Sequence, residues 1–193
     1  RIREILAEND SVDWATLVHI NRENAEYHMV APYFAPYLIG LLENRAPDHP
    51  ELENALEFLK AWPKKDAPGC SATLLVNEWI METMIALLGP EFGFFVERNM
   101  DLTNLQIFGI LTFRVLQPDR SGVELKGDYL NGRDGDALAF KCFLRVLRRL
   151  IAQHGPDMET WPYEPPMHDL THIGRYPWRQ SGTYWMAVEL SDP

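Results

Sequence analysis

The C-terminal tail, residues 155–190, gives the clearest indication of the fold and reads GPDMETWPYEPPMHDLTHIGRYPWRQSGTYWMAVEL. Gly155-Pro156-Asp157 ends a long segment of helical periodicity, and a proline-rich loop carrying Trp161 and His168 follows. Tyr184–Leu190 then predicts one β-strand. Because a lone strand cannot satisfy its backbone donors and acceptors, this strand must join a sheet formed elsewhere. We therefore expect the chain to be part of a larger structure.

Upstream of the tail, apolar residues recur at spacings of three and four, the pattern typical of amphipathic helices. We expect helices over 12–20, capped by Ser11; 24–42, kinked or split by Pro32 and Pro36; 50–62; 71–88, stopped by Gly89-Pro90; part of 92–116; and 137–153. Residues 119–136 predict a polar surface loop. The predicted fold is mainly α with a short β return, divided into a helical region (1–155) and a proline-rich loop and strand (156–193).

The composition excludes several classes of function. The 193 residues carry a net charge of −10, and the cluster of Arg145, Arg148 and Arg149 predicts a solvated helix face, so we expect no nucleic-acid partner. No apolar run approaches the ~20 residues of a membrane span. Residue 1 is arginine within a helix-like pattern, and we expect that processing or truncation removed what precedes it.

Cys70 and Cys142 lie far apart and lack a Cys-x-x-Cys spacing, which argues against a metal site and leaves a single disulfide open. His168, Asp169 and His172 lie within five residues of each other, but a metal would need a further ligand. A hydrogen-bonded structural role for His168 is therefore favoured over a site role. We predict no cofactor and no metal.

The remaining candidates for chemistry also favour structural roles. No P-loop, dinucleotide-binding glycine motif, His-Glu-x-x-His or Gly-x-Ser-x-Gly occurs. We expect Trp161 to anchor the loop on the helices, Ser71 to be an N-cap and not a nucleophile, and Cys142 to be an inert core thiol. Solvated or helix-dipole-favoured acids, not general acid–base pairs, are expected at three pairs: Asp10/Asp13, Glu51/Glu53 and Asp134/Asp136.

Two blocks of sequence, in order and spacing, carry a family resemblance. The first comprises Leu59-Lys60-Ala61-Trp62, Pro68-Gly69-Cys70-Ser71-Ala72 and Trp79; the second runs from Leu147 through Gly155, Asp157, Trp161 and His168 to Gly182. They resemble the penicillin amidase (penicillin acylase) family of N-terminal-nucleophile hydrolases, in the C-terminal half of its large chain. The opening segments 1–6 and 12–42 also look like that family's entry into its helical region. Residues 21–24 and 62–64 depart from the family pattern, which leaves the subfamily and substrate class open.

The resemblance implies an αββα hydrolase that releases an acyl group from an amine such as a β-lactam, a homoserine lactone or a lipopeptide. An N-terminal Ser would attack the carbonyl with its own α-amino group, of pKa about 8, as base. That Ser and the oxyanion-stabilising Asn precede the matched region, so no catalytic residue maps onto this chain, which should be inactive alone. The implied partners are the rest of the parent acylase and a small acyl-amide substrate, and the implied location is periplasmic or secreted.

This portion would then act as scaffold and as one wall of the acyl pocket. Candidate wall residues are aromatic, each also favoured as ordinary core: Trp14, Tyr27, Trp62, Trp79 and Phe92. Two alternatives stay open, a non-enzymatic helical binding module for a small apolar ligand or partner protein, and a purely structural domain. The unpaired strand Tyr184–Leu190 predicts self-association of the isolated chain.

Overall fold

The computed structural model describes residues 2–9, 11–45, 50–98, 102–165, 167–170 and 174–177. Most of them are helical, as the sequence predicts. The elements are α1 (Ile2–Ala7), α2 (Trp14–Glu26), α3 (Ala31–Glu43), α4 (Pro50–Lys60), α5 (Ser71–Arg98), α6 (Leu102–Leu116), α7 (Pro118–Ser121), α8 (Gly135–His154), the 3₁₀ helix η2 (Met158–Thr160), β1 (Met167–Leu170) and β2 (Gly174–Pro177).

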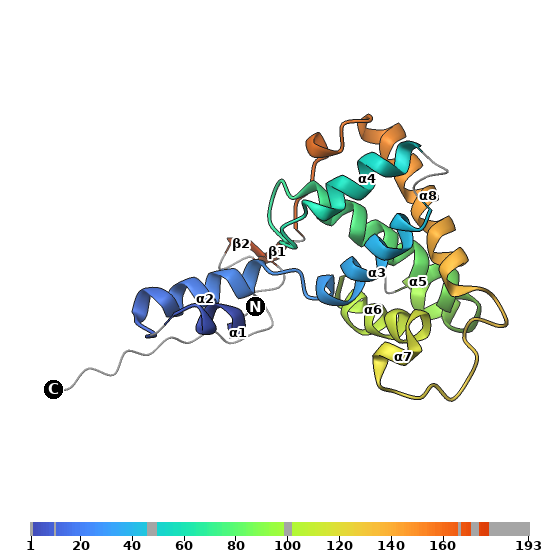
Figure 1. Ribbon diagram of the computed structural model, residues 1–193, viewed down its shortest axis with the longest axis horizontal. Coiled ribbons are helices and arrows are strands. Elements are labelled where there is room, and N and C mark those ends of the chain that lie inside the picture. Colours follow the sequence, from blue (N-terminus) through green and yellow to red (C-terminus); the bar gives the residue numbers. More distant parts are fainter. Residues whose placement is uncertain are drawn as a thin grey trace.

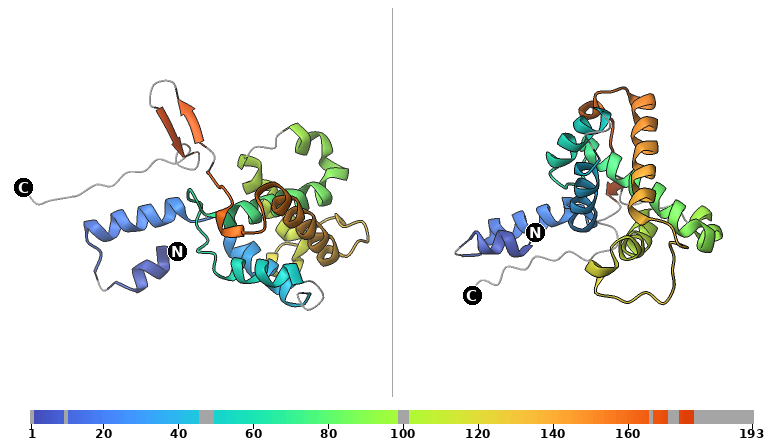
Figure 2. Two further views of the ribbon diagram at one scale, coloured as in Figure 1. Left: turned by 90° about the horizontal axis from the view of Figure 1, so that it is seen from above. Right: turned by 45° about the vertical axis from the view of Figure 1, so that its right-hand side comes forward.

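Helix α5 is the centre of the bundle. It packs against α8 and α6, while α3 packs against α4 on the other side (Figure 1). Trp79 of α5 is completely buried, its indole N–H donates to the Ala139 carbonyl of α8 over 3.0 Å, and its ring meets that of Phe34 of α3 edge to face. One side chain thus ties three helices together. Helices α1 and α2 extend away from this bundle (Figure 2).

Aspartates cap the N-termini of α2 and α8. Asp13 has extended backbone dihedrals and accepts from the Thr16 amide over 2.7 Å, so the prediction of Ser11 as N-cap of α2 was wrong by two residues. Asp134 caps α8 by accepting from the amides of Asp136 and Ala137. A carboxylate at this position satisfies free amides and interacts favourably with the helix dipole.

The predicted helical segment 24–42 is split ahead of its prolines. Residues 27–30 separate α2 from α3, and Pro32 lies in the first turn of α3, where the missing amide hydrogen has no helical partner to lose. Pro36 lies inside α3 without ending it. The break instead coincides with the backbone bridge between Tyr27 and Lys65, which turns the chain toward the loop before α5.

The prediction that Gly89-Pro90 ends the central helix was wrong, because α5 continues to Arg98. A proline inside a helix leaves the carbonyl four residues earlier without its amide donor, and here that carbonyl belongs to Ala86. The guanidinium of Arg133 supplies the missing donor, with Nη1 3.0 Å from the Ala86 oxygen and Nη2 3.5 Å from that of Leu87. A distant arginine therefore replaces the hydrogen bond that Pro90 removes.

The tail contains a hairpin where the sequence predicts a loop. Strands β1 and β2 pair antiparallel, with His168 opposite Tyr176 and Asp169 opposite Arg175, so this part of the loop prediction was wrong. The pairing satisfies backbone groups within the tail itself. The predicted strand Tyr184–Leu190 lies outside the described residues. Within the ranges given above, the hairpin is the only sheet, and the αββα core implied by the resemblance has no counterpart.

Ser71–Pro90 of α5 is long and apolar enough, at a mean hydropathy of 1.3, to cross a membrane, contrary to the expectation that no such segment exists. However, 61% of this window is buried inside the bundle. A core helix surrounded by other helices has the same composition, so length and hydropathy are weak evidence for a span.

Candidate functional site

The tail closes over the N-terminus of α5. The Ser71 hydroxyl, 5% exposed as a residue, points at two tail carbonyls, 2.7 Å from that of Trp161 and 3.1 Å from that of Glu159. The Gly69 amide donates to the Tyr163 carbonyl over 2.9 Å. Trp161 is buried and its indole N–H donates to the Gly155 carbonyl. We call this set of contacts the tail clasp.

Beneath the clasp lies a buried polar network of His28, Asp66, Asn77 and Tyr163. His28 Nε2 is 2.7 Å from the Asn77 amide oxygen, the Asn77 amide nitrogen donates to the Tyr163 hydroxyl over 3.4 Å, and that hydroxyl donates to the Asp66 carboxylate. Each residue is at most 8% exposed. Buried polar groups are tolerated when hydrogen-bonded, so the network fixes four separate segments in one arrangement.

The loop before α5 is also tied to α2. Lys65 Nζ lies 2.9 Å from Glu23 and 3.2 Å from Glu26, and the hydrogen bond from Glu23, followed by that from Glu26, raises the pKa of Lys65 above its ordinary value. The Asp66 amide donates to the Glu26 carbonyl over 2.6 Å. Lys65 is thus held as a cation and cannot act as a base at neutral pH.

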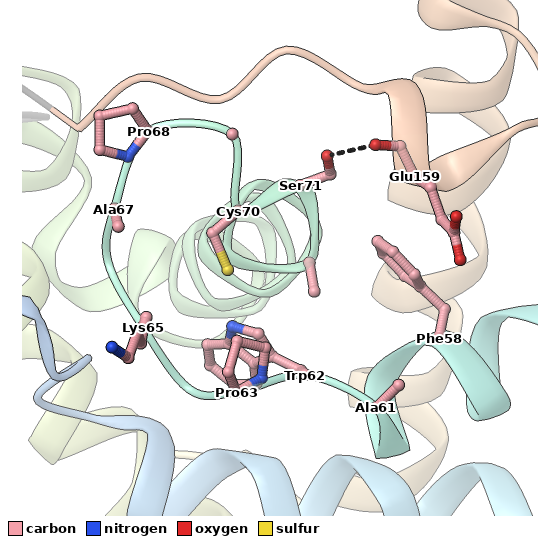
Figure 3. A pocket seen from close by; sticks show the side chains of 12 residues that line it. Phe58, Ala61, Trp62, Pro63, Lys65, Ala67, Pro68, Cys70, Ser71 and Glu159 are labelled. Atoms are coloured by element: carbon pink, nitrogen blue, oxygen red, sulfur yellow. Dashed lines mark hydrogen bonds between the residues drawn. The ribbon is translucent and has the colours of Figure 1, made fainter.

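An open hollow of about 410 Å³ lies where the end of α4, this loop and η2 meet (Figure 3). We call it the clasp hollow. Figure 3 shows the sulfur of Cys70 and the rings of Trp62 and Pro63 around it, with Ser71 turned to Glu159 on the far side. Its lining consists of Phe58, Ala61, Trp62, Pro63, Lys65, Ala67, Pro68, Gly69, Cys70, Ser71, Ala72 and Glu159.

The polar groups of this hollow do not form a nucleophilic centre. The Ser71 hydroxyl donates to backbone carbonyls, which cannot accept its proton as a general base does. The Trp62 indole donates to Thr73, whose hydroxyl donates in turn to the Lys65 carbonyl. These hydrogen bonds of Ser71 and Trp62 therefore fix the shape of the loop.

The sequence matches the penicillin amidase family over residues 1–186. The chain belongs to the penicillin amidase family. No curated protein matches it. The match to penicillin amidase includes both blocks that carry the resemblance, and these are the segments that meet at the tail clasp: the loop with the start of α5, and the tail after α8.

The structure places the predicted acids of this penicillin amidase segment at helix starts. The Thr16 hydroxyl, and then its amide, lower the pKa of Asp13, which is the effect expected of a capping carboxylate. Asp134 caps α8, and Asp136 accepts from the Tyr37 hydroxyl over 2.7 Å. The expectation of dipole-favoured acids is confirmed at Asp13 and Asp134. Asp10 and the Glu51 side chain lie outside the described set.

The structure corrects the prediction for Ser71 and agrees with that for Cys142. Ser71 is the first residue of α5 and bonds the tail instead of a helix amide, so the N-cap prediction was wrong. Both cysteines are free thiols, and burial raises the pKa of Cys142 above its ordinary value. Cys142 is therefore an unreactive core thiol, as the sequence predicts.

The structure places four of the five aromatic wall candidates. Trp79 is core, Trp62 is buried beside His28, and Trp14 is 46% exposed on α2, so it is not core. Tyr27 lies at the bridge to Lys65, and the side chain of Phe92 is outside the described set. The cluster of Arg145, Arg148 and Arg149 lies on the exposed face of α8. There Arg145 pairs with Glu82, and Arg149 pairs with Glu78.

His168 and Asp169 lie in β1, and His172 lies outside the described residues. Among the residues that are described, no group of three or more His, Cys, Asp and Glu side chains could hold a metal ion.

Sequence reasoning missed the buried polar network altogether. Its members lie at positions 28, 66, 77 and 163, so no local spacing connects them. The signal available was the polar Asn77 among the apolar residues between Leu74 and Ile80 of α5, because a polar residue on a buried helix face requires a partner.

Proposed function

We propose that this chain is the helical part of an amide-hydrolysing acylase, which releases an acyl group from an amine such as a β-lactam, a homoserine lactone or a lipopeptide. Its role is to scaffold the enzyme and to contribute a wall of the acyl pocket. The family match over residues 1–186 carries this proposal. The buried serine and the cationic lysine of the clasp hollow support a structural and binding role for this portion.

The chemistry of such an acylase is performed by residues outside this chain. An N-terminal Ser attacks the amide carbonyl, its own α-amino group accepts the hydroxyl proton, and the same group protonates the leaving amine. Backbone amides and an Asn stabilise the oxyanion. By itself the 193-residue chain is expected to be inactive. Its partners are the small chain and the preceding part of the large chain, and export to the periplasm or secretion is proposed on the family alone.

The test is an assay of the full-length parent for amine release from phenylacetyl and long-chain acyl amides. We expect activity, and we expect it to disappear when the N-terminal nucleophile of the mature large chain is replaced by Ala. Ser71→Ala is the matched control, because its hydroxyl bonds only carbonyls and its loss should leave turnover per folded molecule unchanged. Activity that survives removal of the N-terminal nucleophile would overturn the mechanism, and loss of turnover in folded Ser71→Ala would place the nucleophile in this chain.

A further inference from the structure

A second hollow, of about 230 Å³, lies between α3, α6 and α7. We call it the arginine hollow. It shares no residue with the clasp hollow, and it is lined by Val30, Tyr33, Phe34, Ile110, Phe113, Arg114, Arg120 and Ser121.

Aromatic rings form a preorganised apolar surface in this hollow. The ring of Phe113 lies 5.4 Å from that of Tyr33 and 5.7 Å from that of Phe34, measured between centroids. Phe113 and Phe34 are buried, whereas Tyr33 is 51% and Ile110 42% exposed. The buried rings are held by their neighbours, so an apolar ligand entering between the exposed residues meets a surface that needs little ordering.

Two arginines line the same hollow. Arg120 lies over the Phe113 ring, with Cζ 5.8 Å from its centroid. Neither Arg114 nor Arg120 pairs with a carboxylate among the residues that the structure describes. Asp119 precedes Arg120 in α7, but no ion pair joins a carboxylate to either arginine among the described residues. Arginine matches the two oxygens of a carboxylate with parallel N–H donors.

We infer that the arginine hollow binds a small organic carboxylate whose tail is apolar, with Arg114 and Arg120 receiving the carboxylate and the Phe113 surface receiving the tail. The aromatic surface alone would accept any apolar molecule, and the arginines alone would accept any anion. The combination selects a molecule that carries both features. This inference is independent of the proposed amide hydrolysis, since it requires no turnover and uses no residue of the tail clasp.

The test is equilibrium dialysis of the full-length protein against octanoate, with octanol and octylamine as the neutral and cationic counterparts. In the double variant Arg114→Gln/Arg120→Gln two charge-assisted contacts are lost, so we expect the affinity of this site for octanoate to fall by about tenfold or more. At octanoate concentrations that fill the site in the wild-type protein, the variant should therefore bind one octanoate fewer per molecule. Ile110→Trp, which fills the mouth without changing charge, should remove the same equivalent. Arg22→Gln, on the exposed face of α2, is the matched control and should bind as the parent does.

Two results would overturn the inference. One is an unchanged number of bound octanoates in both the arginine and the tryptophan variants. The other is equal binding of octanol or octylamine at the site that these variants remove, which would show that the arginines do not select the ligand. Ile110→Trp leaves both guanidiniums in place, so it still tests whether octanoate binds in the arginine hollow if the arginine variant fails to fold.

Discussion

Ser71 joins the tail to α5 through one buried hydroxyl that faces two carbonyls from a segment almost ninety positions away. When such a donor is removed, the buried Trp161 carbonyl loses a hydrogen-bond partner, and the cost is that of its desolvation. In the buried polar network beneath the clasp, Asn77 and Tyr163 also join distant segments, because each donates one hydrogen bond and accepts another. Long-range contacts of this kind hold the tail clasp together.

Ser71→Ala should lower the free energy of unfolding by about 1–3 kcal/mol, because the Trp161 and Glu159 carbonyls lose their donor. Urea unfolding followed by tryptophan fluorescence measures this change. The control is Thr160→Ala, whose exposed hydroxyl bonds only the Asp157 carbonyl of its own turn and should cost about 0.5 kcal/mol or less. Equal effects in the two variants would show that the clasp does not stabilise the fold.

The ion pairs of Lys65 predict that the free energy of unfolding falls at alkaline pH. Since Glu23 and Glu26 raise its folded pKa above the ordinary 10.5, its contribution is fully present below that pH and is lost as the pH rises through the folded value. The group is partly exposed, so the contribution is roughly 0.2–1 kcal/mol. The unfolding free-energy difference between the wild-type chain and Lys65→Met should be constant from neutral pH up to the ordinary lysine pKa of 10.5 and should shrink above it. Lys126→Met, at an exposed position, should show no such trend.

Helix α5 shows how much of an element can be predicted and where prediction fails. Its start and its apolar character are visible in the sequence, and so is the row of buried apolar residues along one face of α8. Its continuation beyond Pro90 is not, because the donor that permits it comes from Arg133, more than forty residues later. The same reason explains why the candidate site was missed. Helical periodicity is local, whereas a buried polar network depends on the tertiary fold.

Arg133→Met should therefore destabilise the end of α5 by about 1–3 kcal/mol, since the Ala86 carbonyl loses its donor. In a Pro90→Ala background the cost should be smaller, because Ala at this position restores the helical amide. Hydrogen exchange of α5 amides measures the opening free energy in each of the four proteins of this cycle. The same cost of Arg133→Met in both backgrounds would contradict the compensation. Arg22→Met serves as the control for loss of an exposed arginine.

Taken as a whole, the molecule has a well-packed centre and an extended arm. The bundle around α5 buries Phe34, Trp79 and Phe143, whereas α1 and α2 reach outward from it (Figure 1). On α2, Trp14, Leu17 and Val18 are between 39% and 46% exposed. Exposed apolar side chains on neighbouring turns of one helix are typical of surfaces that another element covers. Such a surface bears on how the chain behaves alone.

We predict that the isolated 193-residue chain associates through the strand expected at Tyr184–Leu190, because an unpaired strand offers its free amides and carbonyls to a second copy. Ala187→Pro removes one amide donor from the centre of that strand and should shift the chain toward monomer in sedimentation velocity. Lys126→Pro, in the exposed segment before α8, is the matched control and should leave the association unchanged. If Ala187→Pro associates as strongly as the parent, the strand is not the contact, and the exposed side chains of α2 become the surface to test. If the isolated wild-type chain is monodisperse and has amidase activity, both this prediction and the proposal that the chain is inactive alone are contradicted.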